Sequence, residues 1–420
     1  MNVGGPAVQV SGLMRGLPPD LFDQTLITGF CDENEADYLD THGTGIEAIR
    51  LSGLGRTIRP LDDAAVFGKL VSHIRRTRPH IVHTHTAKAG AIGRVATKLS
   101  GSRAKTIHTY HGHLLHGYFD ATKTRAVIGA EQLLSQASNR LVTVGYSVRD
   151  DLLSVGVGAP EKYRVIPPGI QIGPLPSKHD ARRALGIPET GPVLSFIGRV
   201  TGIKRPDRFI EVALSVSKHR PDAQFVIVGD GDLMRETQDK VRRSNAPIQF
   251  LGMQNEVETC LAASDGVVLT SDNEGTPIGL IEAAMAGIPV VASDVGSVHE
   301  VVRDGETGWL AAPDAAALSA AVLELLRGPE EAKRRGNSAR NLAEQRFGVS
   351  RFLNDYEQLY TEVLNEGLGA LPELDRATPQ GAMERFLDSA DRGDFAFRRA
   401  EAVTGIVVRH RRVVGAHDEN

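Results

Sequence analysis

Short β-type runs alternate with helical patterns twice along the chain, and a stretch rich in proline and glycine separates the two series. This break is YRVIPPGIQIGPLPSKHD at residues 163–180. Regular alternation of strands and helices is typical of parallel sheets covered by helices. The chain has 420 residues, which also favours more than one core. The sequence therefore predicts two α/β domains, one on each side of the break.

The predicted strands are rich in the branched and aromatic residues that favour extended backbone. They are residues 22–30, 46–51, 80–85, 104–111 and 139–145 in the first series, and 192–200, 223–231, 248–253, 266–271 and 288–293 in the second. The helical pattern is clear at residues 62–77, where Val66, Leu70 and Ile74 lie on one apolar face. We expect two Rossmann-like domains at residues 1–170 and 171–349.

The two ends of the chain depart from this pattern. It begins MNVGGPAVQV, and a Gly-Gly loop before a helix normally follows a buried strand at the centre of such a sheet, here between residues 22–30 and 80–85. We therefore expect the first strand to be missing and Met1 to be an internal methionine of a longer protein. At the other end, we expect a closing helix at residues 350–366 and an appended, partly disordered tail at residues 367–420.

Composition excludes several classes of function. A net charge of −4 gives no electrostatic case for a nucleic-acid partner. The two cysteines, Cys31 and Cys260, lie too far apart in sequence to suggest a disulfide framework or a cysteine-rich zinc site. No apolar run is long enough to span a bilayer and no signal peptide is recognised, so we expect a cytoplasmic protein. The basic helix end at residues 75–78 would suit the inner face of a membrane, although a solvated helix end is the commoner explanation.

The most informative stretch is SDNEGTPIGLIEAAMAGIPVVASDVGSVHEVV at residues 271–302. Glu274 precedes a glycine-containing turn, and Glu282 lies within the helix that follows. Such a turn presents free backbone N–H groups and the positive end of a helix dipole. Ligands of open α/β sheets bind at the carboxyl ends of the strands, so both carboxylates are expected to line a cleft. The combination suits a ligand with hydroxyls and phosphate, such as a nucleotide sugar; two solvated carboxylates are the alternative.

A second motif, FIGRVTGIKRPD at residues 196–207, places Arg199 just past a strand and Lys204 at the head of the next helix. Two fixed cations at a strand end can neutralise a diphosphate leaving group. The stretch is not a Walker A loop, because Ile203 stands where that loop needs glycine. A surface arginine and lysine without a ligand are the alternative.

Together these residues resemble the retaining glycosyltransferases of family 4, which have the GT-B fold of two Rossmann-like domains facing each other across a cleft. The resemblance covers nearly all of residues 1–366 and is most specific across Gly198–Lys204 and Glu274–Glu282. It implies transfer of a sugar from a UDP- or GDP-linked donor to a glycan, lipid-linked or small-molecule acceptor, with retention of the anomeric configuration. It also implies that neither a metal ion nor a cofactor is needed.

The resemblance assigns roles to individual residues. Arg199 and Lys204 would hold the donor diphosphate, Glu274 the hydroxyls of the donor sugar, and Glu282 the ribose. The loop around Gly229–Gly231 would bind near the base. Further donor-binding residues would be Gly4, Gly5, Met253, Gly275, Thr276, Ile278 and Gly279.

One departure from the family pattern is Thr276-Pro277, where many members have Phe-Gly. Pro277 cannot donate an N–H, so the number of amides that face the donor sugar is altered. The departure bears on the identity of the sugar more than on the class of reaction.

Eight of the fourteen histidines lie between His73 and His116. His83 and His85 share one face of a strand, which makes a zinc site one hypothesis, weakened by the lack of nearby cysteines or clustered carboxylates. The resemblance offers another: His111, with His113 as its alternative, would reach the donor sugar near the transferred carbon and act with Glu274 in catalysis. His83 and His85 would then be structural or lie near the acceptor.

Three other functions compete with this hypothesis. A nucleotide-sugar epimerase would need placed acid–base carboxylates in the first half, where no convincing set occurs. A non-catalytic protein that binds sugar nucleotides is disfavoured because Arg199, Lys204, Glu274, Glu282 and His111 occur together. A nicotinamide dehydrogenase is disfavoured because GGPAVQ is not GxGxxG.

Overall fold

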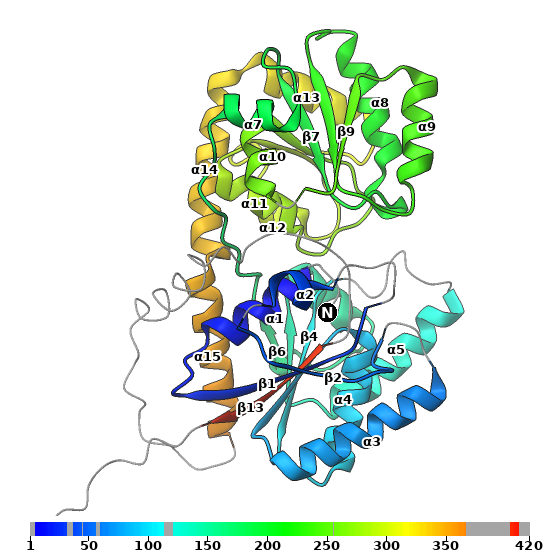
Figure 1. Cartoon of the computed structure of the whole chain (residues 1–420), viewed down its shortest axis with the longest axis vertical. Coiled ribbons are helices and arrows are strands. Elements are labelled where there is room, and N and C mark those ends of the chain that lie inside the picture. Colours follow the sequence, from blue (N-terminus) through cyan, green and yellow to red (C-terminus); the bar gives the residue numbers. More distant parts are fainter. Residues whose placement is uncertain are drawn as a thin grey trace, which may run out of the picture.

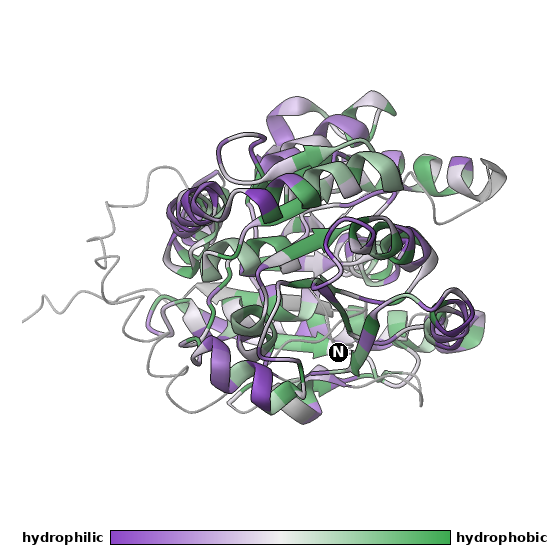
Figure 2. Ribbon diagram, turned by 90° about the horizontal axis from the view of Figure 1, so that it is seen from above, coloured by the Kyte–Doolittle hydropathy of each residue, from purple (hydrophilic) through white to green (hydrophobic). Residues whose placement is uncertain are grey.

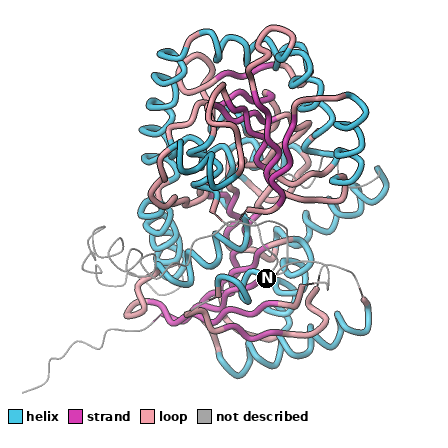
Figure 3. Tube along the Cα trace, turned by 45° about the horizontal axis from the view of Figure 1, so that its top comes forward, coloured by secondary structure: helices cyan, strands magenta, loops and turns pink. Residues whose placement is uncertain are grey.

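The structure is a computed structural model, and it describes residues 5–31, 37–43, 45–55, 59–112, 121–254, 256–366 and 404–410. These residues form two α/β domains, one above the other, each with a sheet between helices (Figures 1 and 3). The predicted fold of two Rossmann-like domains is confirmed. The predicted strands are found within a few residues of their expected bounds.

The first sheet has the strand order β2-β1-β13-β3-β4-β5-β6 in the described part of the chain. Its strands are β1 (Phe22–Thr28), β2 (Ala48–Arg50), β3 (Ile81–His85), β4 (Lys105–Tyr110), β5 (Arg140–Thr143), β6 (Tyr163–Val165) and β13 (Thr404–His410). All pairs of neighbours are parallel except those that include β13.

Strand β13 lies between β1 and β3. This is the central position in which a strand before the Gly-Gly loop was expected. Strand β13 runs antiparallel to both neighbours, so that Ile406 pairs with Leu26 on one side and with His83 on the other. Figure 1 shows β13 in red beside the blue β1. The expectation that all of residues 367–420 form an appended tail is therefore wrong for residues 404–410, while residues 367–403 and 411–420 lie outside the described residues.

The second sheet is entirely parallel, with the order β12-β11-β10-β7-β8-β9. Its strands are β7 (Val193–Ile197), β8 (Gln224–Val228), β9 (Ile248–Gly252), β10 (Gly266–Leu269), β11 (Val290–Ser293) and β12 (Trp309–Ala311). Four of them, β7, β8, β10 and β11, are nearly continuous apolar runs, as expected for strands buried on both faces.

The helices flank the two sheets, and their apolar faces point towards the strands. Figure 2 shows hydrophobic residues along the strands and hydrophilic residues on the outer helix turns. The helices are α1 (Gly5–Gly16), α2 (Tyr38–His42), α3 (Pro60–Thr77), α4 (Ala87–Leu99), α5 (Ala121–Gln136), α6 (Tyr146–Ser154), α7 (Lys178–Leu185), α8 (Pro206–Ser217), α9 (Met234–Ser244), α10 (Val257–Ala263), α11 (Ile278–Ala286), α12 (Val298–Val301), α13 (Ala315–Arg327), α14 (Pro329–Phe347) and α15 (Val349–Asn365), with short 3-10 turns at Pro160–Lys162 and Gly202–Lys204. No helix among these described residues is both long and apolar enough to cross a bilayer.

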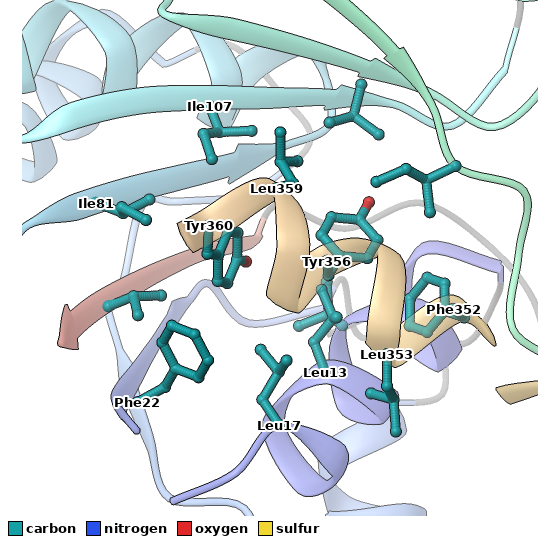
Figure 4. Close-up of a cluster of buried hydrophobic side chains, with 14 of the residues drawn as sticks. Leu13, Leu17, Phe22, Ile81, Ile107, Phe352, Leu353, Tyr356, Leu359 and Tyr360 are labelled. Carbon is teal, nitrogen blue, oxygen red and sulfur yellow. The ribbon is translucent and has the colours of Figure 1, made fainter. Parts of the chain in front are cut away.

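Helices α14 and α15 run as a column along both domains (Figure 1). Helix α14 packs on α11 of the second domain, and α15 returns to the first domain, where it packs on α1 and the sheet. In Figure 4, Tyr356, Leu359 and Tyr360 of α15 lie against Leu13 of α1 and Ile107 of β4. The predicted closing helix is thus part of the first domain's core, and burial of its large side chains ties the two domains together.

The predicted break at residues 163–180 begins with β6 and then crosses between the domains. Gly169 exchanges two hydrogen bonds with the buried side chain of Gln9 on α1, with donor–acceptor distances of 3.2 and 3.4 Å. The N–H of Ile170 donates to the carbonyl of Phe347, at the end of α14, at 2.7 Å. The connection is therefore fixed to helices of both domains.

Candidate active site

A pocket lies between the two domains at the carboxyl ends of their strands. His111 reaches it from the end of β4, Arg199 from the end of β7, and Glu274 from the loop after β10. All predicted site residues that the structure describes line it: Gly5, His111, Arg199, Lys204, Met253, Glu274, Gly275, Thr276, Ile278, Gly279 and Glu282. Gly229 of the expected base-binding loop also lines the pocket. Gly4 and His113 lie outside the described residues.

Two of the predicted glycines are positions where the domains approach each other closely. A Cβ atom on Gly275 would lie 3.1 Å from the Cα atom of Gly112 in the first domain. A Cβ atom on Gly5 would lie 2.9 Å from Cδ1 of Ile278 at the start of α11. Glycine at these positions leaves room for the two domains to approach each other around the pocket.

Lys204 and Glu274 form an ion pair inside the pocket, through Nζ and Oε1. The hydroxyl of Ser271 donates to the same carboxylate oxygen at 2.5 Å. Glu274 is only 9% exposed, so this ion pair compensates a charge that would be costly to leave alone. The resemblance predicted separate ligand contacts for these residues but not their contact with each other.

The loop that carries Glu274 is anchored to the turn that carries Lys204. The Thr270 hydroxyl lies 2.9 Å from the carbonyl oxygen of Lys204, and the N–H of Asp272 donates to Ile203 at 2.9 Å. Buried Arg208 on α8 donates to the carbonyl of Thr270 at 2.6 Å and pairs with Asp272 at 2.7 Å. Sequence reasoning missed Arg208; the available signal was an arginine on the apolar face of a helix, between Pro206 and Phe209.

Arg199 is half-buried in the pocket wall. Its guanidinium has no ion-pair or hydrogen-bond partner among the described residues, unlike the neighbouring Lys204, Arg205 and Arg208. Its five N–H donors are therefore available to an anion that enters the pocket.

Helix α11 begins at the pocket with Ile278 and Gly279, whose N–H groups have no acceptor within the helix. Glu282 lies one turn further along α11 and is 2% exposed. Thr276 donates its hydroxyl to the carbonyl oxygen of Val144 in the first domain at 2.9 Å. Thr276, which stands where many members of the family have phenylalanine, thus forms a hydrogen bond between the two domains.

The partly buried His111 is joined to two fully buried histidines of the first domain. Its Nε2 lies 2.9 Å from Nδ1 of His85, and the His85 ring lies against that of His83 with centroids 4.1 Å apart. His83 in turn bonds through Nδ1 to the hydroxyl of Tyr360 on α15 and through Nε2 to that of Thr109, both at 2.7 Å. The side chain at the pocket is therefore supported from β3, β4 and the closing helix.

Removal from water favours the neutral form of these imidazoles, because a charged ring loses hydration there. It lowers the pKa of His111 to about 4 and the pKa of His83 to about 3. Burial also moves the pKa of His85 well below its usual value, and the neighbouring histidines add to this effect. At neutral pH, His111 can donate and accept hydrogen bonds but carries no charge.

The zinc hypothesis does not fit this arrangement. Both ring nitrogens of His83 are bonded to hydroxyls, and the facing nitrogens of His85 and His111 are bonded to each other. Within the described residues, no group of three or more His, Cys, Asp or Glu side chains is placed to hold a metal ion. His83 was expected to be structural or to lie near the acceptor. Its two buried hydrogen bonds, to Tyr360 and Thr109, agree with a structural role.

Sequence reasoning also missed Glu300 of α12, which contacts the first domain. Its carboxylate accepts the backbone N–H groups of Tyr146 and Ser147, at the start of α6, at 2.9 and 2.8 Å. A carboxylate from one domain thus caps a helix of the other. The sequence holds no local signal for this contact, because its two sides are 153 residues apart.

Comparison with known proteins agrees with this geometry. Residues 3–173 match the family described as Glycosyltransferase Family 4, and residues 177–342 match the family described as Glycosyl transferases group 1. The chain is 30% identical over 309 residues to the UDP-Gal:alpha-D-GlcNAc-diphosphoundecaprenol alpha-1,3-galactosyltransferase of Escherichia coli, covering 70% of this chain and 77% of that protein. The chain is a family 4 glycosyltransferase.

Other relatives of this glycosyltransferase differ in their named reactions. It is 26% identical to the N-acetyl-alpha-D-glucosaminyl L-malate synthase of Bacillus anthracis, over 73% of this chain and 81% of that one. Among solved structures, Anabaena HepE with UDP and glucose has a TM-score of 0.71 at 20% identity, covering 85% of this chain and 96% of that chain. The sucrose-phosphate synthase of Thermosynechococcus elongatus has a TM-score of 0.72 at 22% identity, covering 87% and 96%. These two structures share the fold.

Proposed function

We propose that this glycosyltransferase transfers a hexosyl group from a uridine diphosphate sugar to its acceptor, with retention of the anomeric configuration and without a metal ion. The observation that carries the proposal is the composition of the pocket. Two cations, two buried carboxylates and the start of α11 face a neutral histidine of the other domain. These groups match a ligand that has a diphosphate, sugar hydroxyls and a reacting carbon between the domains.

Arg199 and Lys204 are the groups that would take the role of a metal at the diphosphate. Arg199 has its guanidinium donors available, and Lys204 is partly neutralised by Glu274. A diphosphate bound at Arg199 would compete with Glu274 for Lys204 and release that carboxylate towards the sugar hydroxyls. Fixed cations in a partly buried cleft stabilise charge that develops on a leaving group.

His111 would orient the donor sugar and stabilise charge near the transferred carbon. The proposed step is a front-face substitution. The bond between the anomeric carbon and the acceptor oxygen forms on the face from which the diphosphate oxygen departs, and the acceptor proton passes to the leaving diphosphate. The protein supplies position and electrostatics, and no side chain becomes covalently attached to the sugar.

The choice of uridine as the base of the donor and the choice of acceptor classes rest on different observations. The name of the Escherichia coli relative specifies a UDP-linked donor, and the Anabaena structure was solved with UDP. The acceptors named for the relatives range from a lipid-linked sugar to malate and an inositol phosphate. Glycans, lipid-linked sugars and small hydroxylated acids are therefore the acceptor classes to compare.

The test is a panel of nucleotide sugars incubated with the protein in the presence of EDTA. We expect a UDP-sugar, and no GDP-sugar, to raise the melting temperature and to release UDP, slowly with water and faster with the right acceptor. Proton NMR of the product should show the anomeric configuration of the donor. Turnover of a GDP-sugar alone, an inverted product, or activity abolished by EDTA and restored by a divalent cation would contradict the corresponding part of the proposal.

A further inference from the structure

The bond between His85 and His111 joins two neutral rings, so only one of its two nitrogens can carry the hydrogen. Nδ1 of His85 and Nε2 of His111 are 2.9 Å apart. Either His85 donates and His111 accepts, or the reverse. Nδ1 is the remaining nitrogen of His111 in both cases, and the direction of this bond decides whether Nδ1 carries a hydrogen or a lone pair.

The surroundings of His85 favour one direction. Its ring is fully buried, and its other nitrogen, Nε2, has no hydrogen-bond partner in the described part of the chain. If His111 donated, His85 would have to carry its hydrogen on Nε2, which would place an N–H in the core without an acceptor. Buried N–H groups without acceptors are rarer in proteins than acceptors that lack a donor. His85 therefore carries its hydrogen on Nδ1 and donates it.

The ring of His85 is also packed closely by its neighbours. His83 lies against it at a centroid distance of 4.1 Å, and His83 is fixed by hydrogen bonds from both of its nitrogens. The next residue, Thr86, has the left-handed φ of 62°, which threonine rarely adopts, and it leads directly into α4. The end of β3 thus holds the donor nitrogen of His85 towards His111.

We propose that His85 is a positioning residue that fixes the tautomer of His111, so that His111 accepts at Nε2 and presents Nδ1–H to the pocket. The inference deepens the proposed function, because it rests on His111 being the histidine that meets the donor sugar. A hydrogen-bond donor at this point would bind a sugar hydroxyl oxygen without taking a proton from it. The opposite tautomer would present a lone pair instead, and the contact with that oxygen would be lost.

The first test needs no change of residue. In protein labelled with ¹⁵N-histidine, the two ring nitrogens of His111 have different chemical shifts in the two tautomers, and their signals are assigned by their loss in His111→Gln. We expect the hydrogen on Nδ1 at pH 7.5. A hydrogen on Nε2 of His111 in the unchanged protein would overturn the inference.

The second test distinguishes loss of the His85 hydrogen bond from loss of the folded structure. In His85→Phe, which keeps a flat ring against His83 but has no donor, we expect the His111 tautomer to become mixed. We expect kcat to fall by about tenfold or more, with the KM for the donor changed less than about twofold. In His85→Asn, whose side-chain amide can donate from near the Nδ1 position, most of the kcat should return.

An unchanged tautomer together with an unchanged kcat in folded His85→Phe would contradict the role of His85. Equal loss in His85→Phe and His85→Asn, with the tautomer of His111 unchanged in both, would also contradict it. Full turnover in His111→Gln would contradict the proposed function instead, while the tautomer in the unchanged protein would still decide the role of His85.

Discussion

The carboxylate of Glu300 accepts the backbone N–H of Ser147 across the domain interface, at 2.8 Å. It accepts the Ser147 hydroxyl and the Tyr146 N–H as well, both at 2.9 Å, so one side chain of α12 satisfies three donors at the start of α6. The contact joins α12 of the second domain to α6 of the first. It is one polar contact between the domains, and the contact of Thr276 with Val144 is another.

Replacing Glu300 with alanine should weaken the domain interface. A carboxylate that caps a helix and accepts three hydrogen bonds contributes about 1–2 kcal/mol. We expect a melting temperature lower by several degrees and faster backbone hydrogen exchange at residues 146–149. Glu306→Ala is the matched control, because Glu306 is exposed and pairs with Arg303 only at 3.6 Å. Equal exchange rates in the two variants would show that the cap does not hold α6.

Arg199 and Lys204 should differ in their effect on stability although both are proposed to bind diphosphate. Either change to alanine should weaken UDP binding by about 1.5–3 kcal/mol, measured by calorimetry. Lys204→Ala should also lower the melting temperature, since it leaves the buried carboxylate of Glu274 without its cation. Arg199→Ala should leave the melting temperature unchanged.

A second substitution separates the effect of Lys204 on UDP binding from its effect on stability. In the double variant Lys204→Ala with Glu274→Gln, both charges of this ion pair are removed together, so the melting temperature should return towards that of the unchanged protein. UDP binding should stay weak, because the cation is still missing. Recovery of UDP affinity in the double variant would mean that Lys204 acts only by compensating Glu274.

The buried histidines should make the first domain sensitive to acid. The pKa of His83 is lowered to about 3 and that of His111 to about 4, so both stay neutral in the folded protein while the unfolded chain takes up protons below about pH 6.5. Unfolded protein then binds more protons, and each such histidine removes about 1.4 kcal/mol of stability per pH unit as the pH falls from 6.5 towards 4.

The measurement is the melting temperature of the first domain between pH 8 and pH 4.5. His83→Gln, which keeps a side chain able to bond Tyr360 and Thr109, should reduce the slope of stability against pH below 6.5. His219→Gln changes an exposed histidine of the second domain and should leave the slope unchanged. A slope that is the same in all three proteins would mean that His83 is protonated in the folded state.

The sequence and the family resemblance together named residues that line one pocket, and two of them follow strand ends that carry strong local signals. Arg199 follows an apolar run that ends at Ile197, and Glu274 comes just before the glycine-containing turn that leads into α11. In a parallel sheet such strand ends meet at one edge whatever the order of the strands. Pocket residues could therefore be named before any distance between them was known.

The contacts between distant segments could not be predicted in this way. Thr276 and Glu300 bond to backbone groups of the other domain, which have no side-chain identity to recognise. The Lys204–Glu274 pair depends on two adjacent loops whose separation is set by β7 and β10. The segment TGIVVRH at residues 404–410 has an apolar run, but its place in the sheet depends on pairing with strands more than 300 residues away.

The last prediction concerns β13, on which the first sheet depends. Its seven residues pair with all of β1, and five of them pair with β3. Val408 is fully buried and belongs to the same core as Phe22, Ile81 and Tyr360. Without β13, the facing edges of β1 and β3 would keep unpaired backbone groups in the core, each at a cost of about 1–3 kcal/mol. Only a few such groups equal the net stability of a domain, roughly 5–15 kcal/mol.

A chain that ends at residue 366 should therefore lose the cooperative unfolding of its first domain and its turnover, while a chain that ends at residue 410 should keep both. Val408→Asp, which places a charge in the core of the intact chain, should destabilise the first domain by about 3 kcal/mol or more. A synthetic peptide of residues 404–410, added to the chain that ends at 366, should restore part of the turnover with a saturable dose response, because it can pair with the same two strands. Full stability and turnover in the chain that ends at 366 would show that β1 and β3 do not depend on this strand.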